Sequence, residues 1–549
     1  MGYAHDYAAA IMRRNRVGME PIGFVPNWPD GPRKTKYFPG VDSLPLPGGD
    51  YPADATLERG LDLADGEPPG GERPFDLGSL SGMLLDSYGL TGRRLGVQAN
   101  SDLSALPFYP LANWSRGTAS GGGLYPLSIY WVSGPSGPLP PGVHYYATRH
   151  HAMQRLLTGD VSGEVRAALG EGAPGSGSTD QFLVVGVKHW QNAFKYNSFS
   201  FHVVTMDLGA ALQTWRMWAR ARGLSVEPAL WFDEERLARL LGVRTEEEGI
   251  FAVIPLTWDG AGTRAEAGTG TGTGSDTELP ASPEVATGAS VRHRDVERSR
   301  TVLTFEAILK MQAATAEHAT ARPAPGALAP AAAPPAGDGE RLPLPAAEPP
   351  ATDVRTALRQ RRSSFGRFDA QRPVTAVQLA TCLAAAHAGA RLGGDTAHAQ
   401  DPPLAKLYAV VSHVEGIAPG AYAYDPATHE LESVKDGHLG LFLQKNYFLA
   451  NYNLEQAGAV LVSTVRTDAV LDAVGDRGYR LVNATIGAVA QTLYTATSAM
   501  ELGCGVALGF DNISYIEEFG IEDTGEAPLL IMMIGNERPD PADFRHEIA

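Results

Sequence analysis

The order of structural signals in the second half of this 549-residue chain repeats the order in the first half. The stiff apolar run LSIYWV at 127–132 has a counterpart in KLYAVVS at 406–412. Long stretches with helical apolar spacing follow at 199–223 and 479–503, and each predicts a buried helix. The repetition predicts two copies of one domain. Such a chain imitates a symmetric homodimer, and a site at its two-fold interface can be built once from unlike halves.

Composition divides the chain into four segments. Residues 1–75 are rich in Pro, Gly and turn formers and predict an extended arm. Residues 76–260 form the first domain, which closes with the strand pattern IFAVIPLTW, and residues 351–549 form the second. Between them, 261–350 collapse into Gly/Thr and Ala/Pro tracts that cannot bury enough apolar area to order themselves. We therefore expect a low-complexity linker, interrupted by one short helix that docks on a domain.

Charge and cysteine usage narrow the function classes. The formal net charge of −17 argues against a nucleic-acid surface, because counterion-driven binding needs a basic face. The two cysteines, Cys382 and Cys504, lie far apart and have no metal-ligand spacing, so we expect no disulfide framework and no metal site. We see no signal core and no apolar run of membrane-spanning length, so we expect no membrane partner and a cytoplasmic location.

The stretch RGTASGGGLYP at 116–126 places three consecutive glycines before a strand. Such a run is unfavourable in backbone entropy and indicates a place where another group approaches the main chain closely. A Walker-type phosphate loop is excluded because no GK[ST] follows, and no GxGxxG opens a helix for a dinucleotide.

Two motifs in the second half carry polar chemistry. VRTALRQRRSSFGRFD at 354–369 offers guanidinium forks and hydroxyl groups suited to a phosphate, although the motif taken alone is more simply explained as a solvated basic helix end. ELGCGVALGFDNISY at 501–515 begins as a helix stop, and a simple C-cap accounts for Gly503 but hardly for the whole run of small residues that follows.

Taken together, these motifs resemble the nitroreductase fold of FMN enzymes, and more narrowly its SagB-type branch, the azoline dehydrogenases of ribosomal peptide maturation. The resemblance rests on the R-x-S near the second domain's start, the glycine-rich LYP loop, a G-x-Y-x-Y-D turn and a G-x-G followed by F-D. The arm KTKYFPGVDSLPLP and the dipeptide Lys195-Tyr196 are similar to that branch in particular. It implies an α+β chain of two tandem nitroreductase-like domains that form an intramolecular pseudo-dimer.

The resemblance also implies an FMN site shared by the two halves. The phosphate would lie against Arg361, Arg362 and Ser364, with Arg538 as a further positive contact. Ser120, Gly121 and Gly122 would be bare because the ring and its tail pass against them, and Leu124 would pack behind. The backbone of Ala507, Leu508 and Gly509 would face the isoalloxazine edge. Ala119 stands where the family commonly has proline, and Gly366 where it often has a basic residue.

Lys195 and Tyr196 are the expected catalytic pair. Without the surrounding motifs, a surface lysine and a packing tyrosine would be the simpler interpretation. A lysine partly desolvated beside an apolar ring has a lowered pKa and acts as a base. The corresponding place in the second half reads DRGYR and has no lysine, and the first half has no R-x-S. We therefore predict one complete and one vestigial flavin site in each chain.

The implied activity is FMN-dependent dehydrogenation of peptide thiazolines or oxazolines to thiazoles or oxazoles, with oxygen as the final acceptor. A precursor peptide carrying azolines and a cyclodehydratase would be its partners. Two alternatives stay open on the same fold: reduction of nitro compounds or quinones by NAD(P)H, and oxidation of a carrier-bound substrate. A third, from another class, is a flavin-free scaffold for a cyclodehydratase complex.

Overall fold

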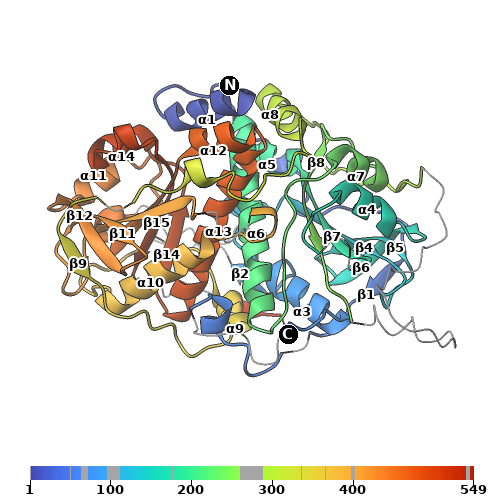
Figure 1. Ribbon diagram of the computed structural model, residues 1–549, viewed down its shortest axis with the longest axis horizontal. Helices are drawn as coiled ribbons and strands as arrows, with labels where there is room; N and C mark the ends of the chain where they lie inside the picture. The colour runs from blue at the N-terminus through green and yellow to red at the C-terminus, as the bar shows by residue number, and fades with distance from the viewer. Residues whose placement is uncertain are drawn as a thin grey trace.

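The computed structural model describes residues 2–49, 51–63, 72–95, 112–175, 177, 179–259, 288–335, 337–364, 366–396, 402–538 and 545–548. Within these residues each half of the chain forms an antiparallel sheet, and helices α6 (Ser200–Arg220) and α13 (Gly478–Ala499) lie between the two sheets (Figure 1).

Equivalent strands follow the same order in the two sheets. The first sheet contains β1 (Ser43–Pro45), β6 (Ala152–Thr158), β5 (Gly142–Ala147), β4 (Leu127–Ser133), β7 (Gln181–Lys188) and β8 (Glu248–Pro255), in this order. The second contains β9 (Arg341–Pro343), β12 (Glu430–Asp436), β11 (Gly420–Asp425), β10 (Ala405–Val411), β13 (Ala459–Val465), β15 (Ala527–Gly535) and β14 (Gly503–Ala507). A small third sheet joins β2 (Gly92–Leu95), β3 (Ala112–Ser115) and β16 (Arg545–Glu547).

Helices surround the two sheets and complete the halves. The remaining α-helices are α1 (Tyr3–Arg13), α2 (Leu57–Gly60), α3 (Leu77–Ser87), α4 (Ser162–Leu169), α5 (His189–Tyr196), α7 (Glu234–Leu241), α8 (Glu306–Ala316), α9 (Val354–Gln360), α10 (Ala376–Gly389), α11 (Gly440–Lys445), α12 (Thr467–Val474) and α14 (Asn512–Phe519). All residues of β4 and β13 are buried, whereas the outer strand β12 is half exposed. Continuous apolar runs therefore form the central strands, as the sequence predicts.

Two glycines allow the central helices to cross closely. A Cβ at Gly209 of α6 would lie 1.8 Å from the carbonyl oxygen of Ala484, and a Cβ at Gly487 of α13 would lie 1.9 Å from that of Met206. The two contacts are reciprocal and have the same sequence offset in both directions. The two glycines therefore have matching roles in the crossing of the two helices.

The predicted strands and buried helices are confirmed, with one shift. The strand predicted at 127–132 is β4, and the helix predicted at 199–223 is α6. This helix ends at Arg220 because the chain turns over the next residues and Gly223 adopts a φ of +69°.

The first part of the N-terminal arm is helical and packed, unlike the expected extended arm. Helix α1 buries Ala4, Tyr7, Ala8 and Ile11, which share one face, and it packs against α8, α12 and α14. The Pro- and Gly-rich composition of the later arm concealed this short periodic stretch. In Figure 1, α1 lies over the top of α12 and beside α8.

The second part of the predicted linker is also ordered. Residues 260–287 lie outside the described residues, but Val291 and Val296 donate backbone hydrogen bonds to Leu240 and Tyr37. Helix α8 docks, as expected, and contacts α1, α6 and α13. The prediction of disorder was wrong here because a segment poor in apolar residues needs no core of its own when it hydrogen-bonds to an existing surface.

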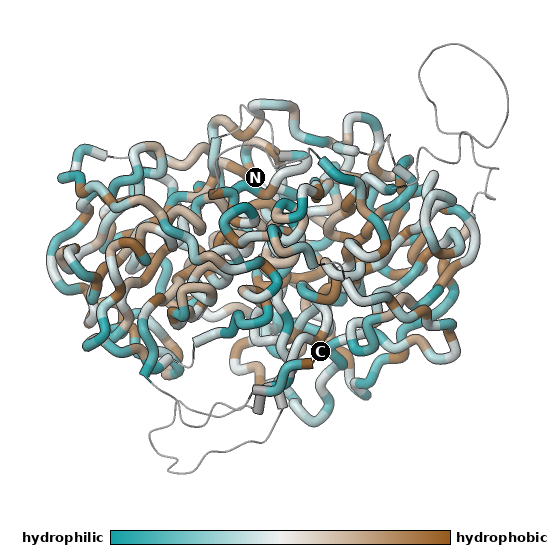
Figure 2. Tube along the Cα trace, turned by 90° about the horizontal axis from the view of Figure 1, so that it is seen from below, coloured by the Kyte–Doolittle hydropathy of each residue, from teal (hydrophilic) through white to brown (hydrophobic). Residues whose placement is uncertain are grey.

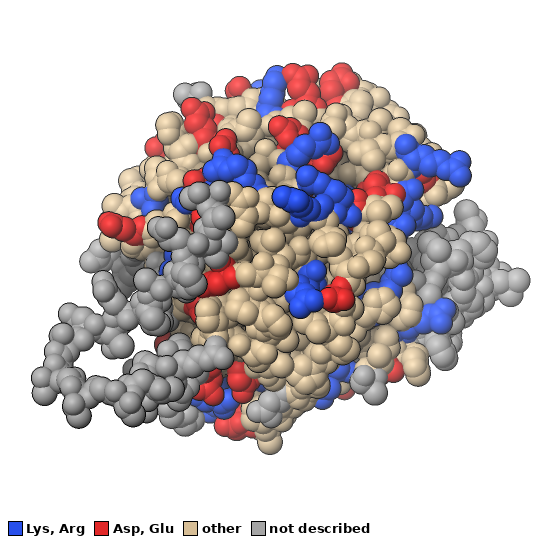
Figure 3. Space-filling model, turned by 90° about the vertical axis from the view of Figure 1, so that its right-hand side faces the viewer, with Lys and Arg blue, Asp and Glu red and all other residues tan. Residues whose placement is uncertain are grey.

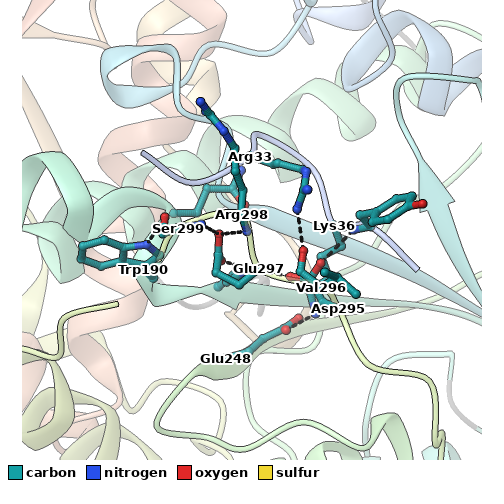
Figure 4. Close-up of polar contacts among 12 residues, drawn as sticks. Arg33, Lys36, Trp190, Glu248, Asp295, Val296, Glu297, Arg298 and Ser299 are labelled. Atoms are coloured by element: carbon teal, nitrogen blue, oxygen red, sulfur yellow. Dashed lines mark hydrogen bonds and ion pairs between the residues drawn. The ribbon is translucent and has the colours of Figure 1, made fainter. Parts of the chain in front are cut away.

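The linker and the arm meet over helix α5. The indole of Trp190 donates to Ser299 Oγ at 2.9 Å, and Lys188 contacts Asp295 at 2.5 Å. Arg33 of the arm donates to the carbonyl of Val296, so arm and linker hold each other (Figure 4). We call the segment 295–299 the linker clasp.

The hydropathy of the chain follows this architecture. Apolar segments concentrate in the interior and polar segments along the outer loops (Figure 2). On the face drawn in Figure 3, basic and acidic side chains are interspersed. Among the described residues, no helix combines the length and apolar character needed to cross a membrane, and none of their His, Cys, Asp and Glu side chains cluster as a metal site would require.

Candidate active site

A cavity of about 620 Å³ lies between the two halves of the chain. Its walls come from the glycine loop before β4, from the end of α5 and the start of α6, and from α13 and the loop after β14. Its volume falls within the range of small-molecule and cofactor sites.

The cavity brings most of the predicted residues together. Ser120, Gly121, Gly122, Lys195, Tyr196, Arg361, Ala507, Leu508 and Gly509 line it. Leu124, Arg362, Ser364 and Arg538 lie outside its lining. Leu124 is buried behind the glycine loop, where its carbonyl accepts a hydrogen bond from Gln191, and Arg538 is exposed.

The glycine loop is bare partly because the protein's own side chains approach it. A Cβ at Gly121 would lie 2.3 Å from Cγ1 of Val203. A Cβ at Gly122 would lie 2.6 Å from both Lys195 Nζ and the Tyr196 hydroxyl, and Gly122 and Gly123 both have a φ of +63°. The sequence-based expectation explained these glycines by the approach of the flavin ring and tail alone. It was incomplete, because Val203, Lys195 and Tyr196 also leave no room for a side chain at Gly121 and Gly122.

Asp207, which the sequence gave no signal to select, fixes the glycine loop from helix α6. Its carboxylate accepts hydrogen bonds of 2.7 Å from the Ser120 hydroxyl and from the Gly121 amide. Ser120 Oγ in turn accepts from the Tyr125 amide at 2.8 Å. Burial raises the pKa of Asp207 from 3.8 to about 7, although both hydrogen bonds oppose the rise. The cavity therefore contains a carboxyl group that titrates near neutrality.

The predicted catalytic pair lies at the end of α5, with the Lys195 ammonium 4.8 Å from the centre of the Tyr196 ring. Burial lowers the pKa of Lys195, since it disfavours the charged ammonium. Burial raises the pKa of Tyr196, and the charge of Asp207 raises it further. The lysine is thus shifted toward its basic form, while the phenol is kept protonated.

Arg14, just after α1, reaches the same cavity. Its guanidinium donates to the Leu508 carbonyl and lies 4.8 Å from the centre of the Phe199 ring. The next residue, Asn15, donates to the Phe510 carbonyl. Burial lowers the pKa of Arg14 to about 10. An Arg in a turn-rich arm carries no spacing signal, so sequence reasoning missed it.

The polar residues Arg361, Arg362 and Ser364 near the start of the second half make two separate sets of contacts. Arg361 donates to the carbonyls of Gly117 and Arg116 at 2.7 and 3.0 Å, and so ties the second half to the glycine loop of the first. Arg362 and Ser364 instead both contact the carboxylate of Glu537.

The equivalent place in the other half is filled by the protein itself. ALWFD at 229–233 corresponds to ALGFD at 507–511, so Trp231 stands where Gly509 lines the cavity. Asp395 accepts hydrogen bonds from the amides of Leu230 and Trp231 at 2.5 and 2.9 Å. The matching amides of Leu508 and Gly509 meet no acceptor among the residues that the structure describes.

Known proteins resemble this chain in part of its sequence and in its fold. Residues 358–536 match the model of the nitroreductase family. Over these residues the chain is similar to members of that family. A putative nitroreductase of Methanocaldococcus jannaschii is 33% identical over 134 residues, which cover 24% of this chain and 64% of that relative. The chain thus spans somewhat less than two thirds of the relative's length.

Solved structures extend the similarity of fold to both halves. The crystal structure of a putative nitroreductase from Anabaena variabilis has a TM-score of 0.67 at 21% identity, and the match covers 98% of this chain and all of that one. A structure of the Escherichia coli microcin synthetase complex is 15% identical, and the match covers 33% of this chain and 70% of the matched chain. Its TM-score of 0.27 is too low to support any argument about function. The predicted mixed α+β, nitroreductase-like fold is confirmed.

Proposed function

We propose that the chain is an FMN-dependent dehydrogenase that converts thiazolines or oxazolines in a peptide to thiazoles or oxazoles. The nitroreductase-family domain supports the oxidoreductase class, and the SagB-type motifs support the substrate. The contrast between the two halves carries the proposal. Asp395 accepts hydrogen bonds from the loop amides of the first half, whereas Leu508 and Gly509 line the cavity and their amides meet no acceptor among the described residues. A ligand with acceptor atoms is therefore expected against Leu508 and Gly509.

The residues present fit a flavin. The cavity has a suitable size, glycines of the loop before β4 line it, and Arg14 and Arg361 supply positive charge around it. The ring edge would lie at Leu508 and Gly509, where amide donors stabilise negative charge on a reduced ring. Bound there, FMN would supply hydride acceptance, the chemistry that the protein side chains lack.

We further propose that the halves act as a fused pseudo-dimer with one working flavin site. The shared strand order and the reciprocal contacts of Gly209 and Gly487 support this arrangement. Trp231 and Asp395 fill the place of the second site. The four-segment division, with an arm to residue 75, a domain at 76–260, a linker at 261–350 and a domain at 351–549, stays part of this proposal.

Converting an azoline to an azole removes one hydride and one proton from the ring. Lys195, with its lowered pKa, takes the proton at Nζ. Tyr196, which stays protonated, donates a hydrogen bond that orients the substrate, and Asp207 keeps the glycine loop in place beneath the pair. The precursor peptide supplies the substrate after a separate cyclodehydratase has closed the ring.

The decisive experiment measures flavin content and single-turnover flavin reduction by a thiazoline peptide. Lys195→Ala is expected to keep the flavin and lose reduction, whereas the exposed Lys310→Ala serves as a matched control and keeps both. Colourless protein, or full reduction by the Lys195→Ala variant, would contradict the proposal. Two flavins per chain would contradict the assignment of a single site.

A second candidate function is favoured by the family match itself, namely reduction of nitro compounds or quinones by NAD(P)H. Steady-state assays separate the two. A quinone reductase oxidises NADPH with menadione and leaves a thiazoline peptide unchanged, whereas the proposed dehydrogenase oxidises the peptide and consumes oxygen.

A further inference from the structure

The carboxylate of Glu537 contacts Arg362 and Ser364, two of the residues that are expected to bind the flavin phosphate. Arg362 Nη1 contacts its Oε1 at 3.1 Å, and Arg362 Nη2 contacts its Oε2. The Ser364 hydroxyl donates to Oε1 at 2.6 Å. We call Arg362 and Ser364 the R-x-S pair. One internal anion thus receives both groups of the pair.

Glu537 is held in this position by the backbone around it. Residue 537 forms a β-bridge with Phe368, and a Cβ at Gly503 would lie 2.4 Å from Glu537 Cγ. The side chain of Glu537 is 14% exposed and that of Arg362 29%. A partly buried, bidentate arginine–carboxylate contact of this kind is stronger than a solvent-exposed pair.

Along the sequence, the two residues of the R-x-S pair alternate with two residues whose side chains line the cavity. Arg361 and Ser363 line the cavity, and the residues next to them, Arg362 and Ser364, contact Glu537. The amide of Ser364 bonds to the carbonyl of Cys504 in β14, the strand that leads into the Leu508–Gly509 loop. A flavin ring on that loop would therefore have the R-x-S pair close to its tail.

We propose that Glu537 is the resident anion of the R-x-S pair, and that a flavin phosphate must displace it to bind there. This rests on the proposed flavin site. Carboxylate and phosphate offer the same acceptor chemistry to a guanidinium and a hydroxyl, so only one of them can occupy the pair. Glu537 therefore lowers the preference of the site for the phosphorylated flavin, FMN, over riboflavin.

The test compares the binding of FMN and riboflavin to purified, flavin-depleted protein by quenching of flavin fluorescence. Glu537→Gln is expected to bind FMN about tenfold more tightly than the wild type, the typical effect of one charged hydrogen-bonding partner, and to leave riboflavin affinity unchanged. Adding Arg362→Gln to Glu537→Gln should return FMN affinity to that of riboflavin. Glu522→Gln, an exposed acid on the same half, removes the same charge and should change neither affinity.

Three results would overturn the inference. FMN affinity of Glu537→Gln within twofold of the wild type is the first, and an equal gain for both flavins is the second. A double variant that keeps the FMN gain is the third, because the phosphate would then not lie on Arg362. If no variant binds either flavin, the proposed function itself fails. Glu537→Ala, with folding checked by circular dichroism, replaces Glu537→Gln if the latter does not fold.

Discussion

Alanine substitutions at Gly122 and Gly123 can distinguish the effect of backbone strain from the effect of contact with Lys195 and Tyr196. Both have a φ of +63°, but a Cβ at Gly123 meets nothing within 4 Å, whereas one at Gly122 meets Lys195 Nζ and the Tyr196 hydroxyl at 2.6 Å. Alanine in the left-handed region costs about 1–2 kcal/mol, and the stiffer unfolded chain returns about 0.4–1 kcal/mol. Both alanine variants should therefore lose about 1 kcal/mol of unfolding free energy.

The two variants should differ in the chemistry of Lys195. Nζ and the phenol oxygen are the ends of flexible side chains, so in Gly122→Ala they move aside at little further cost in stability. Lys195 then leaves its buried position, and its pKa rises toward about 10.4, the value of a free lysine. Gly123→Ala should keep the lowered pKa of Lys195, because its methyl group would not touch that side chain.

Urea unfolding gives the two free energies, and the pH dependence of amine labelling at Lys195, followed by mass spectrometry, gives the pKa. Single-turnover flavin reduction by a thiazoline peptide measures activity. The reasoning is refuted if Lys195 titrates identically in Gly122→Ala and the wild type, or if Gly123→Ala shifts it equally.

Three further changes test other contacts. Because the pKa of Asp207 is raised from 3.8 to about 7, the native state keeps a proton that the unfolded chain releases between these pH values. The contribution of this group to stability therefore declines as the pH rises from about 4 to about 7. Asp207→Asn should flatten that part of the plot of unfolding free energy, measured in urea, against pH. Gly487→Ala would force a methyl group into the Met206 carbonyl and should cost about 3 kcal/mol in thermal unfolding. Gly163→Ala in α4 is the control: its Cβ would meet only the end of the Arg166 side chain, at 4.0 Å, and the variant should gain about 0.5–1 kcal/mol. Equal effects would contradict the close crossing. Ser299→Ala leaves the buried Trp190 donor unpaired and should destabilise by about 1–3 kcal/mol, whereas the same substitution in a Trp190→Phe background, which has no indole donor, should cost much less in the same assay.

The sequence contained the signals that depend on spacing. Apolar runs and the long helical periods predicted β4, β7, β8, α6 and α13, because continuous burial leaves a regular pattern. The resemblance to the nitroreductase fold implied that the glycine loop of one half would share a site with the loop after β14 of the other, and both loops line the cavity.

What the sequence did not reveal depends on pairing between distant residues. Asp207 sits inside a helix among apolar neighbours, and only the fold places it against Ser120. Glu537 follows a strand as an ordinary polar residue, and its contact with Arg362 spans most of the second half. The linker clasp is ordered by hydrogen bonds to the arm and to α5, which composition does not encode. The roles of all these residues in chemistry stay predictions.

The cavity takes one wall from each half of a single polypeptide. In an enzyme assembled from separate subunits, the two walls of such a cavity separate when the enzyme concentration falls below the dissociation constant of the subunits. Here a covalent connection runs from one wall to the other, so dilution cannot take the cavity apart. Specific turnover should accordingly stay constant down to the lowest enzyme concentrations that can be assayed.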